Sequence, residues 1–422
     1  MSTIHFAFFG ILLTSVLLQF YLVASFVYRL RNWRQPLLEN EFCPKAVVVL
    51  CLRGGDPFLT KCIDGLLAQN YPDYDVRFMV DHADDPAMPI LKKALADSDF
   101  ERFQIEVLAS PLTTCSLKCS SLVQAIDGFP DSIEIIALLD ADTIPHPKWL
   151  RELATALVPE NIGAATGNRW YRPTHCGRGS MIRYLWNAAA IVQMYWYGIA
   201  WGGTLAIKMD SIHRSGMLDR WRLAYGEDTM VRSQLLTIRQ KVAFVPSLMM
   251  INREECSVSS FNSWVKRQLL SARLYHPFWL LVVGHGISSS LVLLWGIASG
   301  FALLFEADFI GAGLVFLAIF VFHLCLTSML PWMEKAVFAI AEARGEDVRW
   351  PGKSNFAVVL WIAWLTQWTY TWALLCCLFL HRFNWRGIDY EVAGPFDIKM
   401  RGYKPFRSDR TAESSEVIPH SI

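Results

Sequence analysis

Long apolar runs at both ends of the chain constrain its fold more than any other feature. Residues 4–28 contain no acidic or basic side chain except His5. Three further apolar runs occupy residues of about 279–305, 309–331 and 356–380. A helix needs about 20 apolar residues to cross a bilayer. Because these runs are long enough and hydrophobic residues make up 53% of the chain, we expect an integral, multi-pass membrane protein.

The charges beside the apolar runs predict an orientation. The first run lacks a basic leader and a small-residue cleavage site, so we expect a retained N-terminal transmembrane anchor over residues 1–30. Arg29, Arg31 and Arg34 follow it, and the positive-inside rule places that side in the cytoplasm. About three transmembrane helices are expected over residues 279–380.

An odd number of C-terminal crossings conflicts with the charge of the tail. Three crossings would leave residues 381–422 outside, although this segment is basic and is expected to be a cytoplasmic tail. Either residues 332–343 contain a partial crossing, or one of the three runs does not span. Both alternatives stay open. The last dozen residues, from Thr411, have the composition of a disordered segment.

Residues 43–258 have the mixed composition of a globular domain. Apolar runs at 45–52, 75–80 and 103–108 read as strands, and segments of helical spacing separate them. Alternating strands and helices predict an α/β domain with a mainly parallel, Rossmann-like sheet. Residues 259–278 then combine Trp264 and several leucines with Lys and Arg, which predicts an amphipathic helix in the membrane interface.

Two carboxylates follow a predicted buried strand in the middle of this domain. Asp140 and Asp142 come directly after the run Ile135–Leu139. Open α/β sheets bind ligands beyond the carboxyl ends of their strands, and paired carboxylates suit a hard divalent cation that also holds phosphate oxygens. Mg²⁺ and Mn²⁺ both fit. The alternative is one aspartate that caps and one that turns the chain, which is commoner for an isolated D-x-D.

Other groups along the domain suit transfer from a nucleotide diphosphate donor. Asp81 ends a strand, Glu227 and Asp228 precede a helical segment, and Arg267 and Arg273 lie on the amphipathic helix. A metal would neutralise the diphosphate leaving group, a separate carboxylate would deprotonate the acceptor hydroxyl, and arginines would bind phosphates.

Each of these features also has an ordinary structural explanation. Asp81 could be a turn residue, Glu227-Asp228 a helix cap, and the arginine face a stripe that binds lipid headgroups. Lys118, taken alone, reads as an exposed surface lysine. Their order along one domain between membrane spans favours the chemical interpretation.

Residues 45–275 resemble the inverting, membrane-bound family-2-type glycosyltransferases of GT-A fold, closest to ceramide glucosyltransferases. The resemblance rests on four stretches of the sequence, Asp84–Ala87, Leu138–Asp142, Gly202–Ile207 with Gly216–Asp219, and Gly226–Asp228. The resemblance implies roles for particular residues: Asp81 and Lys118 at the nucleotide and its diphosphate, Asp140 and Asp142 at nucleotide and metal, Gly203 and Thr204 near the acceptor, and Asp228 as the base, beside Glu227. The segment Trp385–Tyr390 also resembles the W-R-G segment after the last helix of these enzymes.

One family motif is altered. The pattern Q/R-x-x-R-W reads Arg267-Gln-Leu-Leu270-Ser271 here. In processive synthases the tryptophan stacks on the acceptor sugar, so its loss argues against a polymer product. It also puts the phosphate role of Arg267 in question, and Arg273 or Lys266 could substitute.

The leading hypothesis is therefore an enzyme that transfers one sugar from a nucleotide-sugar, a UDP-sugar by expectation, to a hydroxyl of a ceramide-like, sterol, hopanoid or glycerolipid acceptor. A processive cell-surface polysaccharide synthase, completed by a homo-oligomer or a partner subunit, is the first alternative. A non-catalytic nucleotide-sugar-binding scaffold is the second. A transporter with His285 and His323 in its pathway is weaker still. The net charge of +1 excludes a general nucleic-acid binder, and the ten cysteines form no disulfide framework.

Overall fold

A seven-stranded sheet forms the centre of the globular part in the computed structural model, which describes residues 3–175, 177–348 and 356–406. The strands in spatial order are β3 (Phe103–Val107), β2 (Tyr74–Val80), β1 (Ala46–Leu52), β4 (Ile135–Leu139), β6 (Thr204–Lys208), β5 (Ile162–Tyr171) and β7 (Lys241–Asn252). Only β6 runs antiparallel to its neighbours. The expected mainly parallel α/β sheet is confirmed.

Both faces of the sheet are buried, which explains the uninterrupted apolar strands. In β1, Val47 and Val49 point into one core, and Val48 and Leu50 point into the other. The helices over one face are α2 (Leu59–Leu67), α3 (Ala87–Ala96) and α5 (Trp149–Ala156). Those over the other face are α4 (Leu117–Ile126), α6 (Arg178–Tyr197), α7 (Met209–Ser215), α8 (Met217–Trp221) and α9 (Val231–Thr237).

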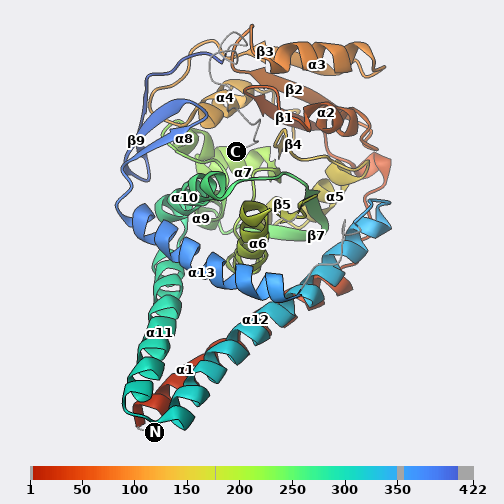
Figure 1. The fold of residues 1–422 in the computed structure, drawn as a ribbon. Coiled ribbons are helices and arrows are strands. Elements are labelled where there is room, and N and C mark those ends of the chain that lie inside the picture. Colours follow the sequence, from red (N-terminus) through yellow and green to blue (C-terminus); the bar gives the residue numbers. More distant parts are fainter. Residues whose placement is uncertain (1–2, 176, 349–355, 407–422) are drawn as a thin grey trace.

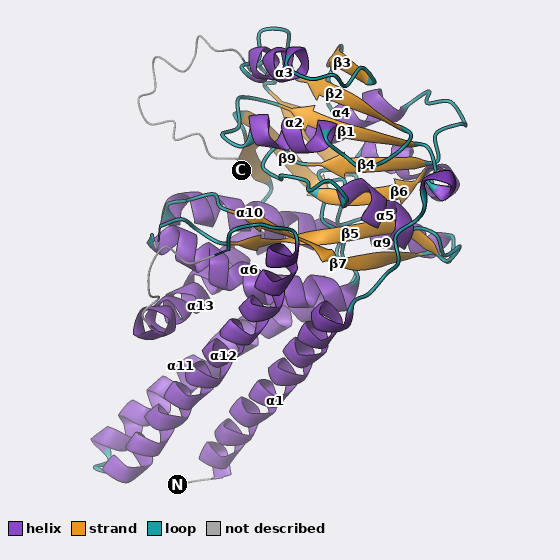
Figure 2. Ribbon diagram, turned by 90° about the vertical axis from the view of Figure 1, so that its right-hand side faces the viewer, coloured by secondary structure: helices purple, strands orange, loops and turns teal. Residues whose placement is uncertain are grey.

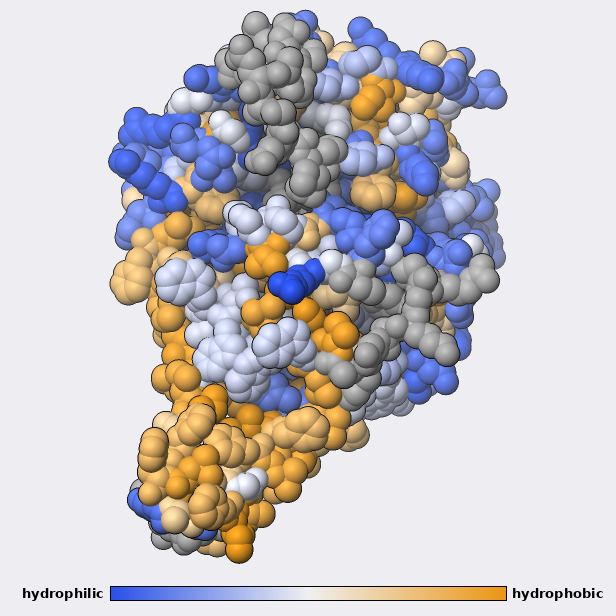
Figure 3. Space-filling view, viewed as in Figure 1, coloured by the Kyte–Doolittle hydropathy of each residue, from blue (hydrophilic) through white to orange (hydrophobic). Residues whose placement is uncertain are grey.

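Three helices extend together away from the sheet domain (Figure 1). They are α1 (Thr3–Asn32), α11 (Trp279–Phe305) and α12 (Phe309–Ala343). These three are the helices of the described chain that are long and apolar enough to cross a membrane. Their outer surface is hydrophobic, whereas the sheet domain above them is largely hydrophilic (Figure 3). Membrane helices at both ends of the chain are thus confirmed.

Helix α13 (Phe356–Leu378), expected as a third C-terminal span, is not one of these candidates. It runs across the base of the sheet domain, beneath α6 (Figures 1 and 2), and contacts α6, α10 and α11. Its sequence includes Thr366, Gln367 and Thr369, and the Gln367 amide donates to Ser290 Oγ of α11 at 2.7 Å. These polar residues lower the mean hydropathy of α13, which favours the alternative that one of the three C-terminal runs does not span.

Helix α10 (Val258–Tyr275) forms where the amphipathic helix was predicted, but the protein itself covers it. Phe261, Trp264, Leu269 and Leu270 are buried, and the helix contacts both α6 and α13. The amphipathic helix forms, and its position in the membrane interface stays a prediction. Apolar side chains of α10 pack against α6 and α13.

The segment expected as a basic tail folds into a second sheet. Its antiparallel strands are β8 (Arg382–Trp385), β9 (Ile388–Gly394) and β10 (Asp397–Arg401). This second sheet packs against the start of α4 and the loop before it. The Leu117 amide donates to the Tyr390 hydroxyl at 3.2 Å, and the Met400 amide donates to the Thr113 carbonyl at 2.8 Å. The segment from Thr411 lies outside the described residues.

Candidate active site

A pocket opens where β1, β2 and β4 end. Arg53, Asp81 and Asp140 are the first residues after these three parallel strands, and all three line it. Parallel strands bring their carboxyl ends to one edge of the sheet, which is why residues far apart in sequence meet there. Helix α10 and the β8–β9 turn close the opposite side of the pocket.

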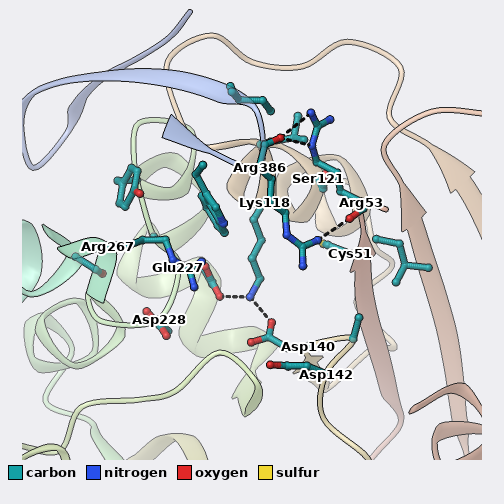
Figure 4. Close-up of a pocket in the computed structure, with 18 of the residues that line it drawn as sticks. Cys51, Arg53, Lys118, Ser121, Asp140, Asp142, Glu227, Asp228, Arg267 and Arg386 are labelled. Atoms are coloured by element: carbon teal, nitrogen blue, oxygen red, sulfur yellow. Dashed lines mark hydrogen bonds and ion pairs between the residues drawn. The ribbon is translucent and has the colours of Figure 1, made fainter. Parts of the chain in front are cut away.

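Lys118 joins two acidic residues at the centre of the pocket (Figure 4). Its ammonium lies 2.6 Å from Asp140 Oδ1 and 2.6 Å from Glu227 Oε1. Ser116 caps α4 by accepting from the Cys119 amide, which fixes the turn that carries Lys118. Burial alone would lower the pKa of Lys118, but Asp140 and Glu227 outweigh it and hold that pKa well above its usual value. Lys118 is therefore a buried cation rather than an exposed lysine.

The aspartate pair has the donor set of a divalent cation site. Burial, followed by the charge of Asp140, raises the pKa of Asp142 to about 7. Asp142 Oδ2 accepts from the Asn252 amide at 3.2 Å. Two half-buried carboxylates that repel one another would gain from a shared cation, so the residues fit a metal. Among the described residues no cluster of three or more His, Cys, Asp and Glu side chains could hold one, so phosphate oxygens and water would have to complete the ligands.

Asp228 is held with its carboxylate facing the pocket. Its Oδ2 accepts from the Gly202 amide at 3.0 Å, and its Oδ1 accepts from the Thr229 amide at 2.6 Å. Glycine at position 202 leaves room for Glu227, since a Cβ there would lie 2.2 Å from Glu227 Oε1 and would displace that carboxylate. Ser271, from the altered family motif, is 2.9 Å from the Thr229 hydroxyl and so supports the same loop.

The Glu227 carboxylate is held in an ion pair and is not free to act as a base. It is 5% exposed and is bound to Lys118. Burial raises the pKa of Glu227, and the nearby charges of Asp228 and Asp140 add to that effect, although Lys118 opposes it. Glu227 thus lies beside Asp228, as expected, but its carboxylate pairs with Lys118.

Two arginines from different elements line the other wall. The guanidinium of Arg267 lies 4.7 Å from the ring centroid of Trp385, and its buried Nε has no hydrogen-bond partner among the described residues. Arg169 of β5 lies 5.0 to 5.4 Å from the ring centroids of Tyr171, Trp201 and Trp264. Half-buried cations with unused donors favour an anionic ligand.

Asp81 is also at the pocket but is covered. It is 2% exposed, and it accepts hydrogen bonds from Arg53, from the Tyr403 hydroxyl and from the Phe406 amide. The residues that cover it come from the chain after β10.

The structure does not bring every candidate to the pocket. Arg273 instead donates to the carbonyls of residues Cys377, Leu378 and Leu380, at the end of α13. Gly203 and Thr204 lie behind Trp201, and the fully buried Thr204 hydroxyl accepts from the Trp149 indole. Neither Gly203 nor Thr204 lines the pocket.

Three pocket arginines were not among the predicted site residues. Arg53 directly follows a strand, which is the position that identified Asp81, so the sequence carried a signal for it. Arg386 lies in the W-R-G segment, and its guanidinium donates to the Arg53 carbonyl at 2.6 Å. Arg169 lies inside a strand and the sequence gives no signal for it.

Comparison with known proteins finds one matching family and several solved structures of low sequence identity. The family described as glycosyl transferase family 21 matches residues 14–394. No curated protein matches the chain. The mannosyltransferase PcManGT from Pyrobaculum calidifontis, in complex with GDP-Man and Mn²⁺, is 14% identical with a TM-score of 0.46, over 88% of this chain and 97% of that one. Glucosyl-3-phosphoglycerate synthase from Mycobacterium tuberculosis, in complex with Mn²⁺ and UDP-glucose, is 13% identical with a TM-score of 0.36, over 56% of this chain and 84% of that one.

Proposed function

Because the chain belongs to glycosyl transferase family 21 and is a glycosyltransferase, we propose that it moves one sugar from a UDP-sugar to a hydroxyl group of a membrane lipid, with inversion. The observation that carries this proposal is the single pocket that gathers Asp81, Lys118, Asp140, Asp142, Asp228 and Arg267 above three apolar helices.

The donor diphosphate would lie between the acidic pair and the arginines. Arg267 and Arg169 offer unused donors there, and guanidinium groups match phosphate oxygens in pairs. Lys118 would hold Asp140 in place and add positive charge near the leaving group. Asp81 would accept a hydrogen bond from the base or ribose once its present partners have left.

Asp140 and Asp142 would hold a divalent cation, Mg²⁺ or Mn²⁺. When bound, such a cation neutralises charge that develops on the diphosphate leaving group. The pairing of Asp140 Oδ1 with Lys118 supports this, because Asp140 keeps its second oxygen for the cation, and Asp142 Oδ1 has only a long contact of 3.4 Å from the Thr143 hydroxyl.

Asp228 would remove the proton from the acceptor hydroxyl. In an in-line displacement the base lies on the side from which the acceptor attacks, opposite the leaving group. The Gly202 and Thr229 amides hold its carboxylate in one orientation, which such a transfer requires. One base acting in a single displacement implies inversion.

The acceptor would enter from the membrane side. Trp264 of α10 lines the pocket and packs edge-on against Trp186 of α6, at 5.2 Å, which in turn contacts Tyr370 of α13 at 6.2 Å. Four exposed apolar side chains follow one face of α13, Val358, Trp361, Trp372 and Leu375, and the exposed Phe379 comes directly after the helix. This face suits a helix lying along the membrane surface, with tryptophans at headgroup level.

This arrangement would also explain why a basic segment follows the last apolar run. If α11 and α12 cross and return while α13 lies flat, the second sheet stays on the same side as the catalytic domain, as its packing requires. Arg29, Arg31 and Arg34 after α1 support a cytoplasmic location for that side. Three spans are also few for the channel that a polymer-extruding synthase needs.

The test is transfer from labelled UDP-glucose, with Mn²⁺ and a total lipid extract, by purified protein in detergent. Label that enters the organic phase with the wild type, but not with Asp228→Asn, supports the proposal. Asp210→Asn, on an exposed part of α7, is the matched control and should transfer normally. Label in a water-soluble polymer would instead identify a polysaccharide synthase. No transfer from UDP-glucose or a panel of other sugar nucleotides would reject an enzymatic role.

A further inference from the structure

We infer that residues 402–406, here named the strap, occupy the nucleobase end of the donor site and compete with the donor for it. This inference rests on the proposed function, because it takes Asp81 as the residue that receives the nucleoside. The strap is the short segment that follows β10, and it contacts Arg53 and Gly54, the first two residues after β1.

The strap uses the hydrogen-bonding capacity of Asp81. The Tyr403 hydroxyl donates to Asp81 Oδ1 at 2.8 Å, and the Phe406 amide donates to Asp81 Oδ2 at 2.9 Å. Arg53 also donates to Oδ2. Both carboxylate oxygens are therefore occupied, and the side chain is only 2% exposed. A base or ribose group cannot reach Asp81 unless the strap donors leave.

The strap also covers the residues next to Asp81. The Arg53 guanidinium donates to the Lys404 carbonyl at 3.1 Å and lies 5.4 Å from the ring centroid of Phe406. A Cβ built on Gly54 would lie 3.2 Å from the same ring. The Phe406 ring thus fills the space beside the end of β1, where a flat nucleobase would otherwise pack.

The chemistry of the strap imitates that of a nucleoside. A hydroxyl and an N–H, each directed at one carboxylate oxygen and accompanied by an aromatic ring, are the groups that a pyrimidine nucleoside would present. Both strap contacts with Asp81 are hydrogen bonds, so hydrogen bonds from the donor can replace them.

The strap can leave Asp81 while the second sheet stays in place. The second sheet is held to the domain through Tyr390 and Met400, independently of Asp81. Release of the strap therefore leaves β8–β10, and the pocket residues Trp385 and Arg386, in place. The strap is a built-in competitor that sets how much donor is needed before transfer begins.

Two substitutions in the full-length protein test this. Tyr403→Phe removes only the hydroxyl donor, and Phe406→Ala removes the ring that covers Arg53. Loss of one hydrogen bond to a carboxylate should lower the KM for UDP-glucose about 5-fold while kcat stays unchanged. Lys404→Gln is the control, because its side chain is exposed and its backbone carbonyl is retained. A higher KM in Tyr403→Phe and Phe406→Ala would mean that the strap builds the donor site, and would overturn the inference.

Hydrogen exchange gives a second readout that needs no turnover. UDP with Mn²⁺ should raise amide exchange at Phe406, because its N–H loses Asp81 as acceptor. Slower exchange on adding UDP would again overturn the inference. If transfer proceeds but both strap variants match Lys404→Gln, the strap inference alone fails. If neither UDP nor GDP binds the wild type or any variant and no sugar is transferred, the proposed function fails and the inference fails with it.

Discussion

The ammonium of Lys118 lies 2.6 Å from Oε1 of Glu227, and both side chains are largely buried, with 19% and 7% exposure. A buried charge that loses its partner is strongly destabilising, whereas loss of both partners is far less so. Lys118→Met should therefore lower the free energy of unfolding by about 3 kcal/mol. The double variant Lys118→Met/Glu227→Met should recover only part of that stability, because Asp140, 2.6 Å from Lys118, loses its cation in both variants, and it should recover no transferase activity.

Thermal unfolding in detergent and the transfer assay together separate these two effects. Recovery of stability without activity would show that the pair serves the site rather than the fold alone. If the single and double variants were equally unstable, the two side chains would not be coupled as the geometry implies.

Metal removal should abolish transfer reversibly. Chelation with EDTA is expected to stop the reaction, and Mn²⁺ or Mg²⁺ should restore it. Asp142→Asn keeps the hydrogen-bonding shape but removes one charged ligand. It should raise the Mn²⁺ concentration for half-maximal activity by at least roughly 10-fold, the loss typical of changes even to groups that support ligands. Full activity of the wild type in EDTA would contradict a metal on this pair.

The sheet and most of the site could be predicted from sequence because both depend on local patterns. The run expected at residues 45–52 is β1 at Ala46–Leu52, and the one at 135–139 is β4. The acidic residues follow strands, so the parallel topology alone brings Asp81, Asp140 and Asp142 to one edge.

The failures came from contacts that no local pattern contains. Arg267 and Arg273 looked equivalent on one helix, but residues six apart differ by about 120° around the axis, so one faces the pocket and the other faces α13. Helix α13 was counted as a span from its apolar content, although packing against α6 and α10 decides its direction. The second sheet is short and stable only on the domain that it covers.

A buried histidine gives a pH dependence outside the active site. Burial lowers the pKa of His146 to about 3, with the Arg344 and Lys148 charges adding to the effect. Because the unfolded chain then binds the proton more readily than the folded one, stability should be complete above pH 6.5 and fall as the pH drops toward 3. Between pH 7 and 5.5 the loss should be about 1 kcal/mol.

His146→Asn tests this, because its amide oxygen can replace Nδ1 as acceptor for the Lys148 amide. Thermal midpoints of wild type and variant, measured from pH 7 to 5.5, should diverge as the pH falls, with the wild type losing more. Burial raises the pKa of Glu152, and this group contributes in the opposite direction. Because Glu152 Oε2 lies 3.9 Å from His146 Nε2, its contribution would differ between the two proteins, so both carry Glu152→Gln in this comparison. Parallel pH profiles would show that His146 is not the titrating group.

Arg169 should replace the motif arginine that this chain lacks. Leu270 stands at that position and is fully buried, whereas Arg169 lines the pocket and, within the described ranges, pairs with no carboxylate. Its charge lowers the pKa of Asp140 and opposes the rise at Asp142, after the larger effects of burial, so it lies within electrostatic reach of the proposed metal site.

Hydrogen bonds to a charged phosphate contribute about 1.5–3 kcal/mol. Arg169→Gln should therefore lower kcat/KM for the donor by roughly 10- to 100-fold. Arg169→Lys keeps the charge but loses the planar fork, so it should recover only part of this loss. Arg214→Gln, on the exposed face of α7, is the control and should leave kcat/KM unchanged. An Arg169→Gln enzyme with wild-type kcat/KM for UDP-glucose would exclude a diphosphate contact and leave Arg267 to make it alone.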